Sequence, residues 1–341
     1  MSMRKLYFDY VRVMAMVAVI GVHLYGSILS AFDDTAVMHV FDSFTTLGVP
    51  IFFSLSGFFA LQKKIENVKE YYEKRFITIV VPFFFYAFIY VFEDNVIQKK
   101  DVIGLFWGPN SYLARVLSGN AYGILWYVYV VSIFYLFAPY LNRLIYSCSH
   151  KEQRGLFSVV IAFQLLIPLY VHVAPMPPFA GYIPAFTMFI GAVVKSTIGY
   201  VAYNLLNFTV NRPIKLLFVV GSFALYCMNV ENAMTLFLFS LYMKTKEKET
   251  KLGVIDTIVT SLSRKSYSIY MIHGAAISAY LTLFSKYITN GYVLLLFGYV
   301  FVLIAAYLFA VVFDKYVVSK AQNAATMIFA KWPVCTMKYG R

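Results

Sequence analysis

Long apolar runs alternate with short charged breaks along this chain of 341 residues. Many of these runs reach the roughly 20 residues that an α-helix needs to cross a bilayer. The half-polar stretch 198–211 fits an interfacial helix. The short apolar run 232–244 fits a tilted or partly re-entrant helix. The pattern predicts an all-α, polytopic membrane helical bundle of about ten transmembrane helices, near residues 7–30, 42–61, 76–97, 122–145, 156–174, 182–198, 213–230, 232–244, 266–285 and 291–313.

Basic residues gather in every second connection between the predicted spans. Of the 29 lysines and arginines, Arg12 lies within a span, 24 fall on one side of the alternation, and four fall on the other, at Lys99, Lys100, Arg115 and Lys286. Short loops rich in Lys and Arg stay in the cytoplasm, so both termini are predicted to be cytoplasmic. The net charge of +13 therefore reflects orientation among membrane lipids, and it predicts no nucleic-acid partner.

The first predicted span carries two ionisable side chains, Arg12 and His23. Eleven helical steps separate them and return to nearly the same face, about 16 Å further along the axis. An ionisable group in hydrocarbon costs at least about 2.5 kcal/mol, so such groups face a protein interior or a watery cavity. The pair is a candidate functional site. The alternative is a snorkelling arginine with a histidine that a neighbouring helix satisfies.

Two other predicted spans have ionisable side chains in them or at their ends. Lys74 and Arg75 precede the third span at the predicted cytoplasmic mouth, where they either bind a coenzyme or simply anchor the helix. His273 shares the ninth span with Ser266, and it is either functional or a hydrogen-bonded core residue.

Other polar residues in the spans have simpler explanations. Asp9 lies one helical turn before Arg12, and pairing with that arginine accounts for it. Ser54 and Ser56 could be nucleophiles, but serine in membrane helices mostly serves packing and hydrogen bonding between helices. The three cysteines have no metal-ligand spacing, so no metal site is predicted.

Four stretches form an ordered set of motifs. Together they resemble the integral-membrane acyltransferase family three, over about residues 7–313. The stretches are Asp9-Tyr10-Val11-Arg12 with His23; the phenylalanine-rich run 49–59 with Leu55-Ser56-Gly57-Phe58; Leu125-Trp126-Tyr127-Val128-Tyr129 with Tyr135-Leu136-Phe137-Ala138-Pro139; and Ser266-Tyr267-Ser268-Ile269-Tyr270-Met271-Ile272-His273.

The resemblance implies an O-acyltransferase domain over residues 1–318, with a cytoplasmic tail at 319–341. It implies transfer of an acyl group, usually acetyl, from cytoplasmic acetyl-coenzyme A to a hydroxyl of a cell-envelope polysaccharide or lipid-linked sugar, in a bacterial plasma membrane. It also implies that His23 is catalytic and Arg12 essential. The imidazole of His23 suits a general base because it exchanges protons near neutral pH.

The remaining predicted site residues come from the same motifs and from the basic pair before the third span. Lys74 and Arg75 are expected to meet the coenzyme. Residues expected to contact substrate are Trp126, Tyr127, Tyr270 and His273.

This chain departs from the family pattern at two positions. Thr78 stands where a second arginine is often found, which bears on the donor-phosphate contacts. Ile124 stands where many members have histidine, which bears on a histidine pair on the acceptor side.

A membrane transporter that exports a polysaccharide or small metabolite is the competing interpretation, because intramembrane ionisable residues also line transport paths. The inverted repeats typical of many carriers are not apparent. A non-catalytic membrane subunit would leave the cost of Arg12 and His23 in lipid unexplained. The acceptor sugar, the acyl chain and the oligomeric state stay open.

Overall fold

A computed structural model describes residues 6–28, 41, 44–149, 151–153, 155, 158–159, 200, 220 and 253–331. Every regular element in this part of the chain is a helix. The prediction of an all-helical membrane protein is confirmed to that extent. Among the described helices, four are long and apolar enough to cross a membrane, at Leu6–Ile28, Val68–Gln98, Gly123–Ser147 and Gly291–Lys331.

The first three predicted spans correspond to helices of different lengths. Helix α1 covers Leu6–Ile28, close to the expected bounds, whereas α3 covers Gly48–Leu61 and begins six residues later than expected. The third helix begins before its predicted span, because the charged segment 68–75 is also helical. It runs without a break through α4 (Val68–Arg75), the π-helical η2 (Phe76–Val80), α5 (Val81–Phe92) and the π-helical η3 (Glu93–Gln98).

Helices also correspond to the fourth, ninth and tenth predicted spans. The short α6 (Tyr112–Leu117) and η4 (Gly123–Leu125) lead into α7 (Trp126–Ser147). Helix α12 covers Val254–Phe284, and α13 covers Gly291–Phe313. The predicted spans at 156–174, 182–198, 213–230 and 232–244 lie outside the described residues, apart from isolated positions.

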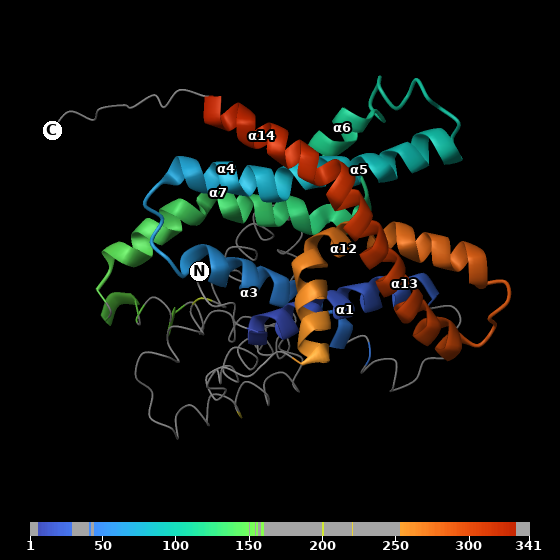
Figure 1. The fold of residues 1–341 in the computed structure, drawn as a ribbon, viewed down its shortest axis with the longest axis horizontal. Helices are drawn as coiled ribbons and strands as arrows, with labels where there is room; N and C mark the ends of the chain where they lie inside the picture. Colours follow the sequence, from blue (N-terminus) through green and yellow to red (C-terminus); the bar gives the residue numbers. More distant parts are fainter. Residues whose placement is uncertain are drawn as a thin grey trace, which may run out of the picture.

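The beginning of the predicted C-terminal tail is helical. The π-helical η6 (Asp314–Val318) joins α13 to α14 (Ser319–Lys331) in one continuous rod, drawn in red in Figure 1. Gln322 Nε2 donates to the Ile77 carbonyl oxygen at 2.9 Å, and the rings of Phe329 and Phe76 meet edge to face at 5.6 Å. Helix α14 therefore packs against the third helix at η2.

Helix α1 is the element around which the site is built. It packs against α3, α12 and α13 (Figure 1). The approach to α3 is close, since a Cβ added to Gly48 would lie 2.6 Å from the Ala15 carbonyl oxygen. Small residues allow this spacing between membrane helices. The contact fixes α1 against the motif helix α3.

A cluster of polar side chains around Asp314 joins three helical elements. Asp314 accepts hydrogen bonds from Tyr86 Oη at 2.9 Å and from Ser268 Oγ at 2.8 and 2.9 Å. Lys265 Nζ lies 2.8 Å from the same carboxylate. Because one carboxylate receives all of these groups, the cluster joins α5, α12 and η6 near the start of the ninth predicted span and the end of the tenth.

Hydrogen bonds join helix ends that are predicted to lie on the same side of the membrane. Tyr10 Oη donates to Asp256 Oδ1 at 2.8 Å, near the starts of α1 and α12. Asn142, near the end of α7, holds the connection that follows α3. Toward the opposite side, the rings of Tyr90 and Tyr122 stack with centroids 4.1 Å apart. The helix directions fit alternating crossings, and the cytoplasmic location of the first side stays a prediction from charge.

Asn142 is fully buried and makes three contacts with that connection. Its Nδ2 donates to the carbonyl oxygens of Lys63 at 2.9 Å and Leu61 at 3.4 Å, and its Oδ1 accepts from the Ile65 N–H at 2.9 Å. One side chain therefore pairs three backbone groups of the connection and fixes it to α7.

We expect Asn142→Leu to lower the free energy of unfolding by about 1–3 kcal/mol, because it strips partners from buried backbone groups. Thermal unfolding of the purified protein in detergent measures the change. Arg143→Leu, at the exposed neighbouring position, is the matched control and should unfold like the unmodified protein. Equal stability of the two variants would contradict this role of Asn142.

Candidate active site

The charged end of the site is a contact between α1 and α12. Arg12 Nη1 donates to Ser263 Oγ at 3.1 Å, and Ser263 Oγ donates to Asp9 Oδ1 at 2.6 Å. Arg12 also lies 3.6 Å from Asp9 on its own helix, as the sequence predicts. Asp9 is 2% exposed, and the Arg12 side chain is 25% exposed. The guanidinium is therefore held from one side while part of it remains accessible.

That accessible part of Arg12 faces a cavity of about 200 Å³. The cavity contains a second arginine, Arg75, together with several hydroxyl groups. It lies among α1, α3, the third helix, α7 and α12. Its lining consists of Arg12, Phe52, Leu55, Ser56, Phe59, Arg75, Ile79, Tyr127, Val131, Tyr135, Ser266, Tyr267 and Tyr270.

Arg75 lies on aromatic faces rather than beside a carboxylate. Its Cζ is 4.4 Å from the Tyr135 ring centroid and 5.2 Å from that of Tyr71. Within the described part of the chain, Arg75 Nε has no hydrogen-bond partner, and no ion pair to Arg75 is present. Lys74 is exposed and does not line the cavity. Arg75 is thus the member of the predicted basic pair that lines the cavity.

The departure at Thr78 has a structural consequence. Its hydroxyl donates to the Lys74 carbonyl oxygen at 2.7 Å and therefore turns back on its own helix. An arginine at this position would have added a third cation close to Arg75. In this chain the interior positive charge of the cavity comes from Arg12 and Arg75.

The structure brings His23 together with His273 from the ninth predicted span. Their ring centroids are 5.2 Å apart, with the planes tilted by 43°. His23 is half-buried on α1, whereas His273 on α12 is fully buried. A histidine pair is therefore present, although its second member comes from α12 and not from the position of Ile124.

The hydrogen bonding of His273 fixes its tautomer. Its Nδ1 lies 2.5 Å from the Tyr270 carbonyl oxygen. A carbonyl oxygen only accepts, so Nδ1 carries the hydrogen and Nε2 of the neutral ring carries a lone pair. Nε2 is buried and has no hydrogen-bond partner among the described residues. This leaves a free acceptor beside His23.

Two tyrosines of the cavity lining, in contact with each other, lead toward the histidines. Tyr127 and Tyr270 meet edge to face at 5.6 Å, and the Tyr270 ring lies 5.5 Å from that of His273. Tyr127 Oη is 3.0 Å from Ser56 Oγ, and Tyr270 Oη donates to the Ile124 carbonyl oxygen. Both predicted tyrosines line the cavity, and Ile124 contributes through its backbone.

The other predicted residues occupy less direct positions. Trp126 is 38% exposed and lies against Phe53 at 6.3 Å, outside the cavity lining. Ser54 is buried away from the cavity, whereas Ser56 lines it. His23 and His273 are not part of the described lining either. Tyr270 lines the cavity and contacts His273, so it links the cavity to the histidine pair.

Sequence reasoning missed Ser263, Tyr135 and Tyr267. Ser263 binds both Asp9 and Arg12, although about 250 positions separate these residues in the chain. Tyr135 opens the fourth-helix proline motif, so its position was noted without a role. Tyr267 had no distinguishing signal among the 29 tyrosines of the chain.

The chemistry available is anion binding at one end and proton transfer at the other. Guanidinium groups bind phosphate through two parallel hydrogen bonds, and a neutral imidazole can accept a proton. Among the described residues, no cluster of three or more His, Cys, Asp or Glu could hold a metal ion.

Comparison with known proteins gives a family for this arrangement. Residues 5–315 match the acyltransferase domain that defines acyltransferase family 3. No curated protein and no solved structure matches the chain. The family match covers nearly the whole sequence, including all four motifs. The chain, a helical membrane protein, therefore belongs to acyltransferase family 3.

Proposed function

We propose that this membrane acyltransferase moves an acyl group, usually acetyl, from acyl-coenzyme A to a hydroxyl of a cell-envelope polysaccharide or lipid-linked sugar, in a bacterial plasma membrane. The observation that carries the proposal is a cavity lined by two arginines and by a tyrosine, Tyr270, that contacts a histidine pair. The transfer needs both a grip on the coenzyme phosphates and a base for the hydroxyl proton.

The reaction exchanges a thioester for an ester. The acceptor oxygen attacks the thioester carbonyl carbon while His23 takes the hydroxyl proton. The carbon–sulfur bond then breaks, and the coenzyme thiolate leaves with the proton from His23. The half-buried position of His23 suits it for this role, since the residue must meet a substrate that arrives from outside the helix bundle.

His273 is the positioning partner of His23. Its Nε2 carries a lone pair without a partner in the described part of the chain, and the two rings are adjacent. The ring nitrogen of His23 that does not face the hydroxyl carries the hydrogen of the neutral ring, and Nε2 of His273 can accept a hydrogen bond from it while the other nitrogen takes the substrate proton. Burial of this contact strengthens it, because a hydrogen bond to a charged group is worth more in a low-dielectric environment.

Arg12 and Arg75 are proposed to bind phosphate groups of the coenzyme, and Lys74 to attract the coenzyme from outside. The flexible pantetheine arm would then reach past Tyr127 and Tyr270. Asp9 and Ser263 hold Arg12 in place, while Tyr135 supports Arg75. The charge pattern of the loops puts this donor entrance on the cytoplasmic side, so the acceptor would reach His23 from the outer half of the membrane.

A transporter remains the second candidate, because the same buried cations and imidazoles could line a path. The two functions differ in what they need: transport requires two compartments, whereas ester formation does not. Purified protein in detergent, given radiolabelled acetyl-coenzyme A and isolated envelope glycans, should form labelled ester and free coenzyme A. Absence of both products with glycans from every candidate envelope fraction would favour transport.

We expect His23→Gln to lower the rate of ester formation at least about 100-fold, because general base catalysis contributes on that scale. Affinity for acyl-coenzyme A should stay nearly unchanged, since His23 does not line the cavity. Single-turnover rates and equilibrium binding of the coenzyme separate these effects. A His23→Gln protein with near-normal transfer would remove His23 from the mechanism.

The role of His273 can be tested by substitution with asparagine or glutamine, whose amide groups lie at different distances from the backbone. Asparagine preserves a donor near Nδ1 for the Tyr270 carbonyl, whereas glutamine extends a polar atom toward the place of Nε2. We expect His273→Asn to lower kcat about tenfold with unchanged coenzyme affinity, and His273→Gln to retain more of the rate. The reverse order of the two variants would show that the Tyr270 contact, and not Nε2, matters.

The two neighbouring basic residues make a matched pair. We expect Arg75→Gln to raise the KM for acyl-coenzyme A about tenfold, since a charge-assisted hydrogen bond is lost inside the cavity. Lys74→Gln should change KM less, and its effect should vanish at high salt because Lys74 is exposed. Equal KM values for the Arg75→Gln protein and the unmodified protein at low salt would move the donor site elsewhere.

A further inference from the structure

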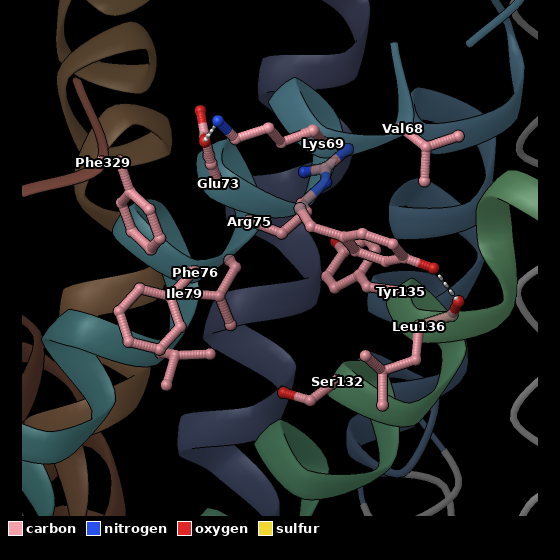
Figure 2. A pocket seen from close by; sticks show the side chains of 12 residues that line it. Val68, Lys69, Glu73, Arg75, Phe76, Ile79, Ser132, Tyr135, Leu136 and Phe329 are labelled. Atoms are coloured by element: carbon pink, nitrogen blue, oxygen red, sulfur yellow. Dashed lines mark hydrogen bonds and ion pairs between the residues drawn. The ribbon is translucent and has the colours of Figure 1, made fainter. Parts of the chain in front are cut away.

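A second, larger recess lies on the other side of Arg75. It has a volume of about 760 Å³ and opens between the third helix and α7, with Phe329 of α14 at its margin (Figure 2). Arg75, Ile79 and Tyr135 line both this groove and the two-arginine cavity. The groove is therefore a separate space that shares one wall with the candidate active site.

The walls of the groove are almost entirely hydrocarbon. Phe76, Ile79 and Val80 form one side, and Leu136 lies opposite. Phe76 is 41% exposed and Leu136 is 58% exposed, so these side chains are available to a bound molecule. One hydroxyl in the lining is already used, since Tyr72 Oη donates to the Leu136 carbonyl oxygen at 2.7 Å. Such walls suit an acyl chain and offer little to a nucleotide.

Charge is confined to one end of the groove. Lys69 and Glu73 form a pair there, with Nζ 3.4 Å from the carboxylate oxygen. Arg75 has no ion-pair partner among the described residues, and its Nε lacks a hydrogen bond there. The end of the groove therefore carries one unbalanced positive charge beside an apolar channel.

The loop charges put this end at the cytoplasmic face, where the inner leaflet presents anionic headgroups. Basic pockets between membrane helices on that side bind such headgroups. We propose that the groove binds an anionic glycerophospholipid of the inner leaflet, with an acyl chain along Phe76, Ile79 and Leu136 and the phosphate at Arg75. This proposal shares Arg75 with the proposed coenzyme site but concerns lipid binding without turnover, so a test without coenzyme can fail independently of the proposed acyl transfer.

The test uses the full chain in nanodiscs of phosphatidylcholine that contain a trace of phosphatidylglycerol with a photoreactive group in its acyl chain. Mapped crosslinks should concentrate on segments 76–80 and 132–136. Excess unlabelled phosphatidylglycerol should suppress them, whereas further phosphatidylcholine should not. A matching photoreactive phosphatidylcholine should label these segments about fivefold less, the difference expected for one basic residue at an anionic headgroup.

Two variants keep the proposal falsifiable. Ser132→Trp fills the groove and should abolish the crosslinks at 76–80, whereas Val317→Trp, in the apolar groove beside Phe88 and Phe313, should leave them unchanged. Arg75→Gln should bring phosphatidylglycerol labelling down to the phosphatidylcholine level. Equal labelling by the two lipids in the unmodified protein, or crosslinks that persist in Ser132→Trp, would overturn the proposal.

Discussion

The fold and the site both depend on the need to satisfy Arg12 inside a membrane. A guanidinium in hydrocarbon must find partners or a polar cavity, and Arg12 has both. Asp9 and Ser263 hold it from α1 and α12, and the cavity receives the rest. Two helices from opposite ends of the chain are thereby joined. Because the same α1–α12 contact brings His23 beside His273, the constraint on one arginine also sets the position of the imidazoles.

The site separates positive charge from the candidate base by an aromatic layer. Arg12, Arg75, Tyr127 and Tyr270 line the cavity, and Tyr270 contacts His273 on the side away from it. Such an order would let the phosphates of a donor bind without exposing His23 to the same cavity. Among the described residues, Tyr127 hydrogen-bonds with Ser56 and Tyr270 donates to the Ile124 carbonyl oxygen, so the rings of this layer are held in place.

The sequence was most informative where contacts are local. The cost of charge in lipid singled out Arg12 and His23, helical spacing paired Asp9 with Arg12, and the motifs identified the family. It could not find Ser263, or show that His273 lies beside His23, because these contacts join helices far apart in the chain. It also treated Lys74 and Arg75 alike, although helix geometry turns only Arg75 inward.

The central claim is that the arginine cavity and the histidine pair belong to one reaction path. Two photoreactive analogues of acyl-coenzyme A test it most directly, one with the reactive group on the acyl end and one with it on the adenine. The acyl-end probe should label α1 and α12 around His23 and His273, and the adenine-end probe should label α4 near Arg75. Labelling of α4 by the acyl-end probe, with none around His23, would contradict the account.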